Sequence, residues 1–185
     1  MLFRSQYVIT DKLNSVIKKS NGKIIINRCE DYGPITKIIP TLNMTSISSR
    51  DFIIVCDDDI YYRKKFPKYL IAAAKKDPNS VHSYCNTDIE GFAGYIGTKK
   101  ILSNILKYNQ PDSCIKLDDN YIEACIKAAN IKIKAVEFPN STGPKSFCSL
   151  DKKNTDQHPS WDELNNTRTK EDIDVCLSDF KLLNK

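Results

Sequence analysis

The chain has 185 residues, of which 41% are hydrophobic and 28% are charged, and its formal net charge is +5. This composition is typical of one globular domain and argues against a disordered chain. No run approaches the roughly 18 apolar residues of a membrane-spanning helix, and the N-terminus lacks the hydrophobic centre of a signal peptide. We therefore expect a single cytoplasmic domain over residues 1–185, with its core at 23–137 and a C-terminal loop and helix at 138–185.

The predicted elements alternate between strand and helix. In chain order they are a helix at 10–20, a strand at 23–27, a helix from Pro34, a strand at 52–56, a helix from Pro67 to about Lys76, a strand at 81–84, a glycine-bearing segment at 90–97, a helix capped by Thr98, a helix from Asp118 or Asp119, a strand at 131–138, a long loop at 140–166 and a last helix after a capping box at 169–172. Such alternation predicts an α/β fold with a mainly parallel sheet.

The cysteines and the basic residues exclude several classes of protein. Seven cysteines form no CxxC pair, and several fall within predicted strands or helices. This pattern indicates buried, reduced thiols rather than a disulfide framework or a zinc site. The basic residues are scattered lysines, whereas nucleic-acid interfaces usually combine clustered basic residues with aromatic ones. We expect no nucleic-acid partner.

Three consecutive carboxylates, Asp57, Asp58 and Asp59, follow directly on the apolar run at 52–56. Two adjacent charges about 5 Å apart repel by roughly 3 kcal/mol at an effective dielectric near 20, unless water, protons or a cation neutralise them. Alternate side chains at a strand end converge on one point, which suits a hard divalent cation. The alternative is an acidic surface turn, but the buried-looking strand before the triplet and the tyrosines after it favour a metal site.

Two further segments are predicted to meet the triplet at the edge of the sheet. A helix that begins near Pro34 offers free N–H groups and carries Lys37 one turn in, a combination that attracts phosphate, although an ordinary helix cap would look the same. Asp118 and Asp119 begin another helix, where one acid can cap the helix and the other can act as a general base. Together these groups suit displacement of a diphosphate from carbon.

Four motifs in this order resemble glycosyltransferases of the GT-A fold, and most closely a family-2-like group with bacterial and large-DNA-virus members. They are Asp31-Tyr32-Gly33-Pro34-x-Thr36-Lys37, Asp57-Asp58-Asp59-Ile60-x-Tyr62, Glu90-Gly91-Phe92-Ala93-Gly94 and Asp118-Asp119. The order and spacing agree over residues 23–137. The resemblance implies a Rossmann-like, mainly parallel sheet flanked by helices.

The resemblance also implies an activity and a role for each motif. The activity is metal-dependent transfer of a sugar, with inversion, from a nucleotide-diphosphate sugar to the hydroxyl of a glycan or other acceptor. The resemblance implies that Asp57, Asp59 and His158 bind Mn²⁺ or Mg²⁺ and that Asp57 and Asp58 contact the donor diphosphate and ribose. It implies that Asp31, Gly33 and Lys37 contact the nucleotide and that Gly91 and Gly94 line the pocket of the donor sugar and acceptor. Asp119 is implied as the catalytic base.

One departure from the family pattern leaves other functions open. GT-A domains begin with a strand–helix–strand unit that forms much of the nucleotide-base pocket, but here only about 22 residues precede the first predicted strand. A shortened domain that binds ligands without turnover is therefore one alternative. A phosphatase of the haloacid-dehalogenase type is another, although Tyr61 stands where its motif requires threonine or valine.

Overall fold

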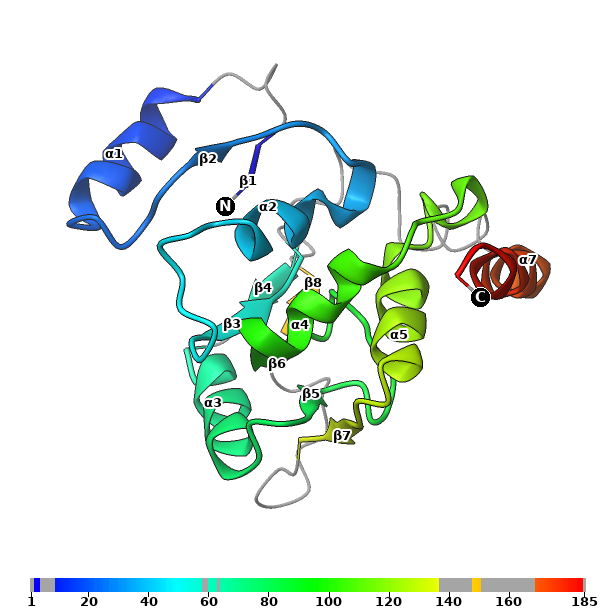
Figure 1. Cartoon of the computed structure of the whole chain (residues 1–185). Helices are drawn as coiled ribbons and strands as arrows, with labels where there is room; N and C mark the ends of the chain where they lie inside the picture. Colours follow the sequence, from blue (N-terminus) through cyan, green and yellow to red (C-terminus); the bar gives the residue numbers. More distant parts are fainter. Residues whose placement is uncertain are drawn as a thin grey trace.

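The computed structural model describes residues 2–3, 9–57, 60–62, 64–136, 148–150 and 169–184. Asp58, Asp59 and His158, which the sequence assigns to donor and metal binding, lie outside the described residues. The main body is a four-stranded sheet with helices packed against it (Figure 1). The predicted α/β class is therefore confirmed.

The sheet is mixed, and its strand order is β3 (Phe52–Val55), β6 (Tyr95–Thr98), β5 (Val81–Ser83) and β7 (Ile133–Ala135). Strand β6 is antiparallel to both β3 and β5, and only β5 and β7 are parallel. The prediction of a mainly parallel sheet is wrong because β6 lies within the glycine-bearing segment, where the sequence pattern shows no separate strand. A strand that returns after a short loop can only pair antiparallel with the one before it.

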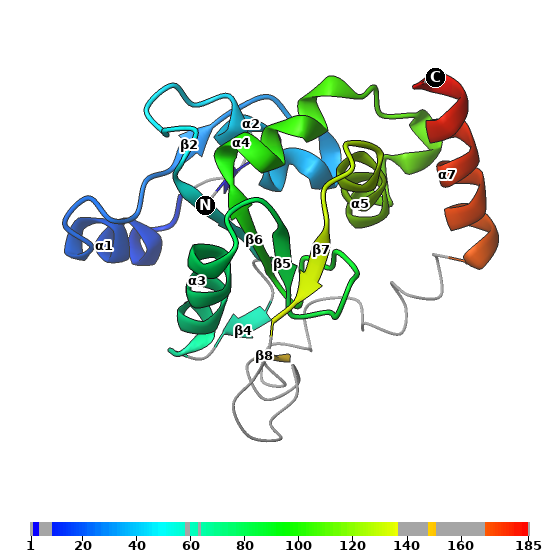
Figure 2. The same cartoon turned by 60° about the horizontal axis from the view of Figure 1, so that its bottom comes forward.

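Helices cover both faces of the sheet. The bounds are α1 Asp11–Lys19, η1 Gly33–Lys37, α2 Ile39–Leu42, α3 Phe66–Lys76, α4 Lys99–Leu102, η2 Ser103–Lys107, η3 Asp112–Cys114, α5 Asp118–Ala128 and α7 Lys170–Leu183, where η marks a 3-10 helix. Figure 2 shows α3 on one side of the sheet and α5 on the other.

Strand β3 shows how the two faces are divided. Ile53 and Val55 point into a large core shared with α5 and α7, whereas Ile54 packs on a smaller core built around α3. Because successive side chains of a strand alternate between faces, the next residue on the Val55 side is Asp57. The alternation thus directs Asp57 toward the face that carries η1 and α5.

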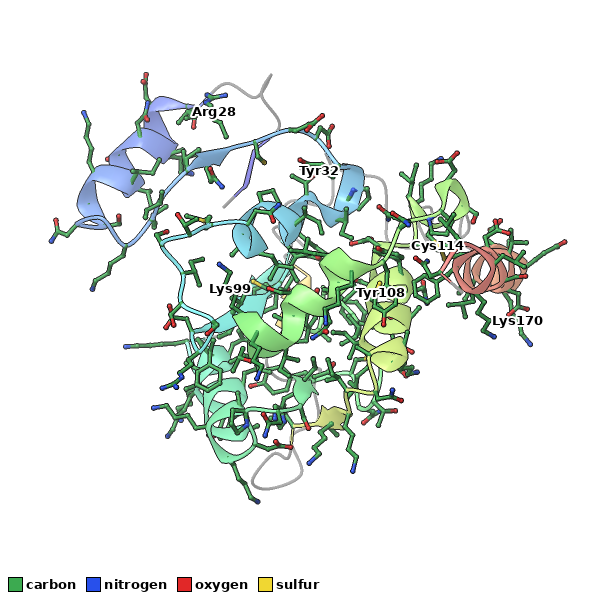
Figure 3. The ribbon with its side chains drawn as sticks, in the orientation of Figure 1. Arg28, Tyr32, Lys99, Tyr108, Cys114 and Lys170 are labelled. Atoms are coloured by element: carbon green, nitrogen blue, oxygen red, sulfur yellow. A yellow bond between two sulfur atoms is a disulfide. The ribbon has the colours of Figure 1, made fainter. Side chains whose placement is uncertain are left out.

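Helix α7 is bound to the segment that leads into α5. Cys176 forms a disulfide with Cys114, with a Cα–Cα distance of 4.9 Å, and Phe180 packs on Tyr108 and Tyr121 with ring centroids 5.5 and 5.9 Å away. Figure 3 shows Cys114 beside α7. The prediction that the cysteines stay reduced is wrong for this pair. The predicted capping box at Thr169 is confirmed.

The N-terminal elements stand apart from the main sheet. Helix α1 begins after Thr10 as predicted, but none of its residues is buried. The predicted strand at 23–27 is largely wrong, because only Asn27 and Arg28 form β2, which pairs with β1 (Leu2–Phe3). A further pair joins β4 (Ile60–Tyr62) to β8 (Cys148–Leu150). Among the described helices, none combines the length and apolar character that a bilayer crossing requires.

Candidate functional site

Three of the predicted motifs meet at the ammonium group of Lys37. Its Nζ lies 3.2 Å from Asp57 Oδ1, 2.8 Å from Asp118 Oδ2 and 2.8 Å from Asp119 Oδ1. Lys37 ends η1, Asp57 follows β3, and the acid pair begins α5. The sequence separations reach 82 residues, so the cluster is a product of the tertiary fold.

Lys37 is placed by a short, well-bonded turn. Asp31 Oδ1 accepts the N–H of Gly33 at 2.9 Å, and Thr36 Oγ1 accepts the N–H of Tyr32 at 2.8 Å. The helix predicted from Pro34 begins as a five-residue 3-10 turn and continues after Ile38 as the short helix α2, and one of the first N–H groups of the turn is already bonded to Asp31. It is therefore not the open helix end that the sequence suggested as a phosphate site. The nucleotide contacts of Asp31 and Gly33 stay predictions.

Neither acid at the start of α5 serves as a helix cap. The N-cap position is Leu117, which makes no side-chain cap bond, and both acids fall in the first turn. A first turn is electrostatically favourable for carboxylates. Asp119 Oδ2 accepts the N–H of Gly91 at 2.8 Å, and Glu123, one turn later, accepts the N–H of Ile89 at 2.9 Å. Helix α5 thus holds the loop that carries Gly91 against the cluster.

Position 91 requires glycine because the side chains of Asp57 and Lys37 lie too close to its backbone for a Cβ atom. A Cβ atom built on Gly91 would overlap the Asp57 carboxylate and would lie 2.5 Å from Lys37 Nζ. The glycine predicted to line a pocket therefore lies directly against the charged cluster. Gly94 lies elsewhere: its φ is +83°, and a Cβ there would overlap the Phe66 ring in the α3-side core.

The cluster combines three carboxylates with one ammonium group in a largely buried position. Asp118 is 2% exposed and Asp119 is 8% exposed. Burial alone would lower the pKa of Lys37, but the facing charges of Asp119, Asp118 and Asp57 outweigh it and raise that pKa above its usual value. Burial also raises the pKa of Asp119, followed by the charge of Asp118, while Lys37 and the Gly91 N–H act against this rise. Lys37 therefore stays protonated, and the surroundings of Asp119 oppose its ionisation.

Two buried polar atoms in the cluster lack a hydrogen-bond partner in the described part of the chain. They are the Tyr95 hydroxyl and Asp118 Oδ2, although the latter still pairs with Lys37 by charge. Burial raises the pKa of the Tyr95 hydroxyl, which lies within electrostatic range of Lys37 and the three acids. Unpaired buried polar atoms are uncommon and mark places where a water or a ligand completes the site.

The donor set fits a cation–diphosphate ligand in its chemistry. Carboxylate oxygens are the preferred ligands of Mg²⁺ and suit Mn²⁺, and a lysine is a common partner of phosphate oxygens. Of the predicted metal ligands the described residues include Asp57 alone, and within those residues no group of three or more His, Cys, Asp or Glu side chains is arranged to hold a metal. The roles of Asp58, Asp59 and His158 stay predictions.

An apolar hollow of about 370 Å³ lies on the α3 side of β3. Its lining residues are Ile54, Cys56, Tyr62, Lys64, Phe66 and Pro67. The sequence did not indicate this hollow, nor the roles of Tyr62 and Tyr95 near the charged groups. The only signal for Tyr62 was its place in the Asp57–Tyr62 motif, which assigns it no role.

The chain was also compared with known proteins. No family model, no curated protein and no solved structure matches it.

Proposed function

We propose that the protein is a metal-dependent glycosyltransferase that moves a sugar from a nucleotide-diphosphate sugar to a hydroxyl acceptor, with inversion and on a GT-A-like fold. One observation carries the proposal. Lys37, Asp57, Gly91 and Asp119 come from four separate motifs of the sequence, and they lie within hydrogen-bonding or van der Waals distance of one another. Carboxylates for a cation, a lysine for phosphate and a spare base are the groups that this reaction needs.

In the proposed reaction the residues of the cluster change partners. Mn²⁺ or Mg²⁺ would be held by Asp57, Asp59 and His158, and it would supply positive charge to stabilise the departing diphosphate. The phosphate oxygens of the donor compete for the Lys37 ammonium and so release Asp119 Oδ1. Asp119 then accepts the proton of the acceptor hydroxyl, whose oxygen bonds to the sugar carbon as the carbon–diphosphate bond breaks. The diphosphate leaves with the electron pair of that bond.

The test is transfer or hydrolysis of nucleotide sugars by the purified protein with Mn²⁺. We expect turnover in the wild type and a loss of at least a hundredfold in Asp119→Asn, which cannot accept the proton, without any loss of nucleotide binding. Asp179→Asn is the matched control, because Asp179 lies on α7, where it accepts a hydrogen bond from Ser113 of η3 at 2.7 Å, outside the cluster. Equal turnover in Asp119→Asn and the wild type would contradict the assignment of the base.

One observation favours a second candidate, a nucleotide-binding protein without turnover. Both carboxylate oxygens of Asp119 are already bonded, Oδ1 to Lys37 and Oδ2 to the Gly91 N–H. If the cluster keeps these bonds when a donor binds, no base is released. Calorimetry with nucleoside diphosphates and Mn²⁺, run beside the turnover assay, separates the two: binding without any sugar transfer or hydrolysis supports the second candidate.

A further inference from the structure

The hydroxyl of Tyr62 lies between the two backbone segments that carry the cluster. Its oxygen accepts a hydrogen bond from the N–H of Asp57 at 3.1 Å. Its proton is donated toward two carbonyl oxygens, that of Gly91 at 3.2 Å and that of Phe92 at 3.1 Å. The Asp57 N–H also reaches Gly91 O directly, at 3.2 Å. One phenol group thus uses its donor and its acceptor to join the end of β3 to the 91–92 loop.

The ring of Tyr62 fixes where this hydroxyl lies. Its centroid is 4.3 Å from that of Phe66, which is 4% exposed and packs in turn on Tyr84 at 5.3 Å. The Phe66 ring fills the space that the missing side chain of Gly94 leaves open. Because the α3-side core holds the ring, the position of the hydroxyl follows from packing and does not depend on the charged residues that it serves.

The bonds of Tyr62 continue into the cluster through Gly91. The Gly91 carbonyl faces Tyr62 and Asp57, while the Gly91 N–H bonds to Asp119 on the opposite side. We propose that Tyr62 is a positioning residue: its hydroxyl sets the distance between Asp57 and the Gly91 loop, and through that loop the place of both acids around Lys37. The ligand-binding consequence rests on the proposed function, whereas the structural coupling does not.

A substitution that removes only the hydroxyl tests the inference. Tyr62→Phe keeps the ring packing on Phe66. The matched control is Tyr84→Phe, because the Tyr84 hydroxyl also bonds to a backbone carbonyl, that of Phe66 at 2.6 Å, in the same core but away from the cluster. Each variant loses one hydrogen-bonded hydroxyl, so an effect that comes only from the loss of such a group appears in both.

The first readout is amide hydrogen exchange at Asp57 and Gly91, measured by NMR. We expect exchange at both amides to rise about tenfold in Tyr62→Phe, the equivalent of one or two lost hydrogen bonds, and to stay at the wild-type rate in Tyr84→Phe. Wild-type exchange in Tyr62→Phe, or an equal rise in both variants, would overturn the inference.

The second readout is the dissociation constant of a nucleoside diphosphate with Mn²⁺, measured by calorimetry. We expect it to rise about tenfold in Tyr62→Phe and to be unchanged in Tyr84→Phe. An unchanged constant in Tyr62→Phe overturns the positioning role in binding. A wild-type protein that binds no nucleotide instead defeats the proposed function, and the exchange measurement still decides whether Tyr62 couples the two segments.

Discussion

Lys37 is the residue on which the charged cluster depends most. Its ammonium neutralises carboxylates from two elements that would otherwise repel one another, and three ion pairs of 3.2 Å or less converge on it. Breaking a buried pair by removing one partner is far more costly than the net value of the pair, since the other charge is left buried without compensation. The cluster is therefore sensitive to the loss of the lysine in particular.

We predict that Lys37→Met destabilises the protein by about 3–5 kcal/mol at neutral pH. Lys134→Met is the control, because Lys134 pairs with Asp77 at 2.7 Å but is 46% exposed, and a surface pair contributes at most about 1 kcal/mol. Urea unfolding of both variants measures the difference. Equal losses in the two variants would show that the ion pairs of Lys37 are not held in a buried position.

The effect of Lys37→Met has a defined dependence on pH. Burial already raises the pKa of Asp119, and removing Lys37 takes away a charge that opposes this rise. When a carboxyl has a higher pKa in the folded than in the unfolded protein, the free energy of unfolding falls as pH rises between the two pKa values. It is regained when the carboxyl is protonated. We therefore expect the destabilisation to shrink as pH falls from about 7.5 to about 5. Urea unfolding at both values checks this, and a loss that grows toward acid would contradict it.

Alanine substitutions of the two glycines in the Glu90–Gly94 motif are predicted to have different effects. In Gly91→Ala the new methyl group takes the space of the Asp57 carboxylate and the Lys37 ammonium, so we expect nucleotide affinity to fall by tenfold or more. In Gly94→Ala the methyl group meets Phe66 at a backbone φ of +83°, which costs about 1–3 kcal/mol of stability. Calorimetry and urea unfolding on both variants separate the effects. Equal affinity in Gly91→Ala and the wild type would contradict the close approach at the site.

At the scale of elements, the contact of α7 with the segment before α5 determines how firmly the acid pair is held. The disulfide at Cys114 lies four residues before Asp118, and Ser113 donates a hydrogen bond to Asp179 of α7 at 2.7 Å. Asn184 accepts the N–H of Asn109 at 2.8 Å and donates to its carbonyl at 3.0 Å. The last helix of the chain thereby supports the start of the helix that carries Asp119.

We predict that reduction of the disulfide lowers the stability by about 4 kcal/mol, since the bond closes a loop across 62 residues in the unfolded chain. The double variant Cys114→Ser/Cys176→Ser should show the lower stability and no response to reductant. Cys85→Ser, which leaves the disulfide intact, should respond as the wild type does. Urea unfolding with and without reductant, together with non-reducing peptide mapping, tests this. A wild-type protein insensitive to reductant would contradict the bond.

At the scale of the whole molecule, the cores on the two faces of the sheet position different parts of the site. The larger core joins η1, β3, α5 and α7 and carries the charged cluster at its rim, whereas the smaller core around α3 fixes the Tyr62 and Phe66 rings. Strand β6 contributes to both, with Tyr95 in the first and Ile96 in the second. The site therefore depends on the whole sheet rather than on one loop.

Thiol reactivity is predicted to report on the opening of the larger core. Cys125 is fully buried in it, and burial raises the pKa of its thiol to about 12, whereas Cys56 is exposed. Because the thiolate is the reactive form, we expect an alkylating reagent to modify Cys56 within minutes and Cys125 only through near-global unfolding. Mass spectrometry of the labelled peptides in increasing urea measures both rates. Rapid labelling of Cys125 in native buffer would contradict this packing.

The local sequence by itself determined most of the helices and the residues of the cluster. Pro67, Thr98 and Thr169 mark the starts of α3, α4 and α7 correctly, because capping and proline effects act within one turn of the chain. The sequence also predicted that Lys37, Asp57 and Asp119 would meet at one edge of the sheet, whereas Gly91 was expected there only from the resemblance, as part of the donor-sugar pocket. Charged residues and glycines in otherwise apolar surroundings are informative because each requires a partner or a close approach.

Only the tertiary structure decided the sheet, the disulfide and the details of the site. The direction of β6 depends on which strands it lies between, and the pairing of Cys114 with Cys176 depends on where α7 docks. The bonds of Tyr62 and the capture of three acids by one lysine likewise depend on distances between segments far apart in the chain. Local patterns fix dihedral angles and faces, whereas these features arise from long-range packing that no single segment specifies.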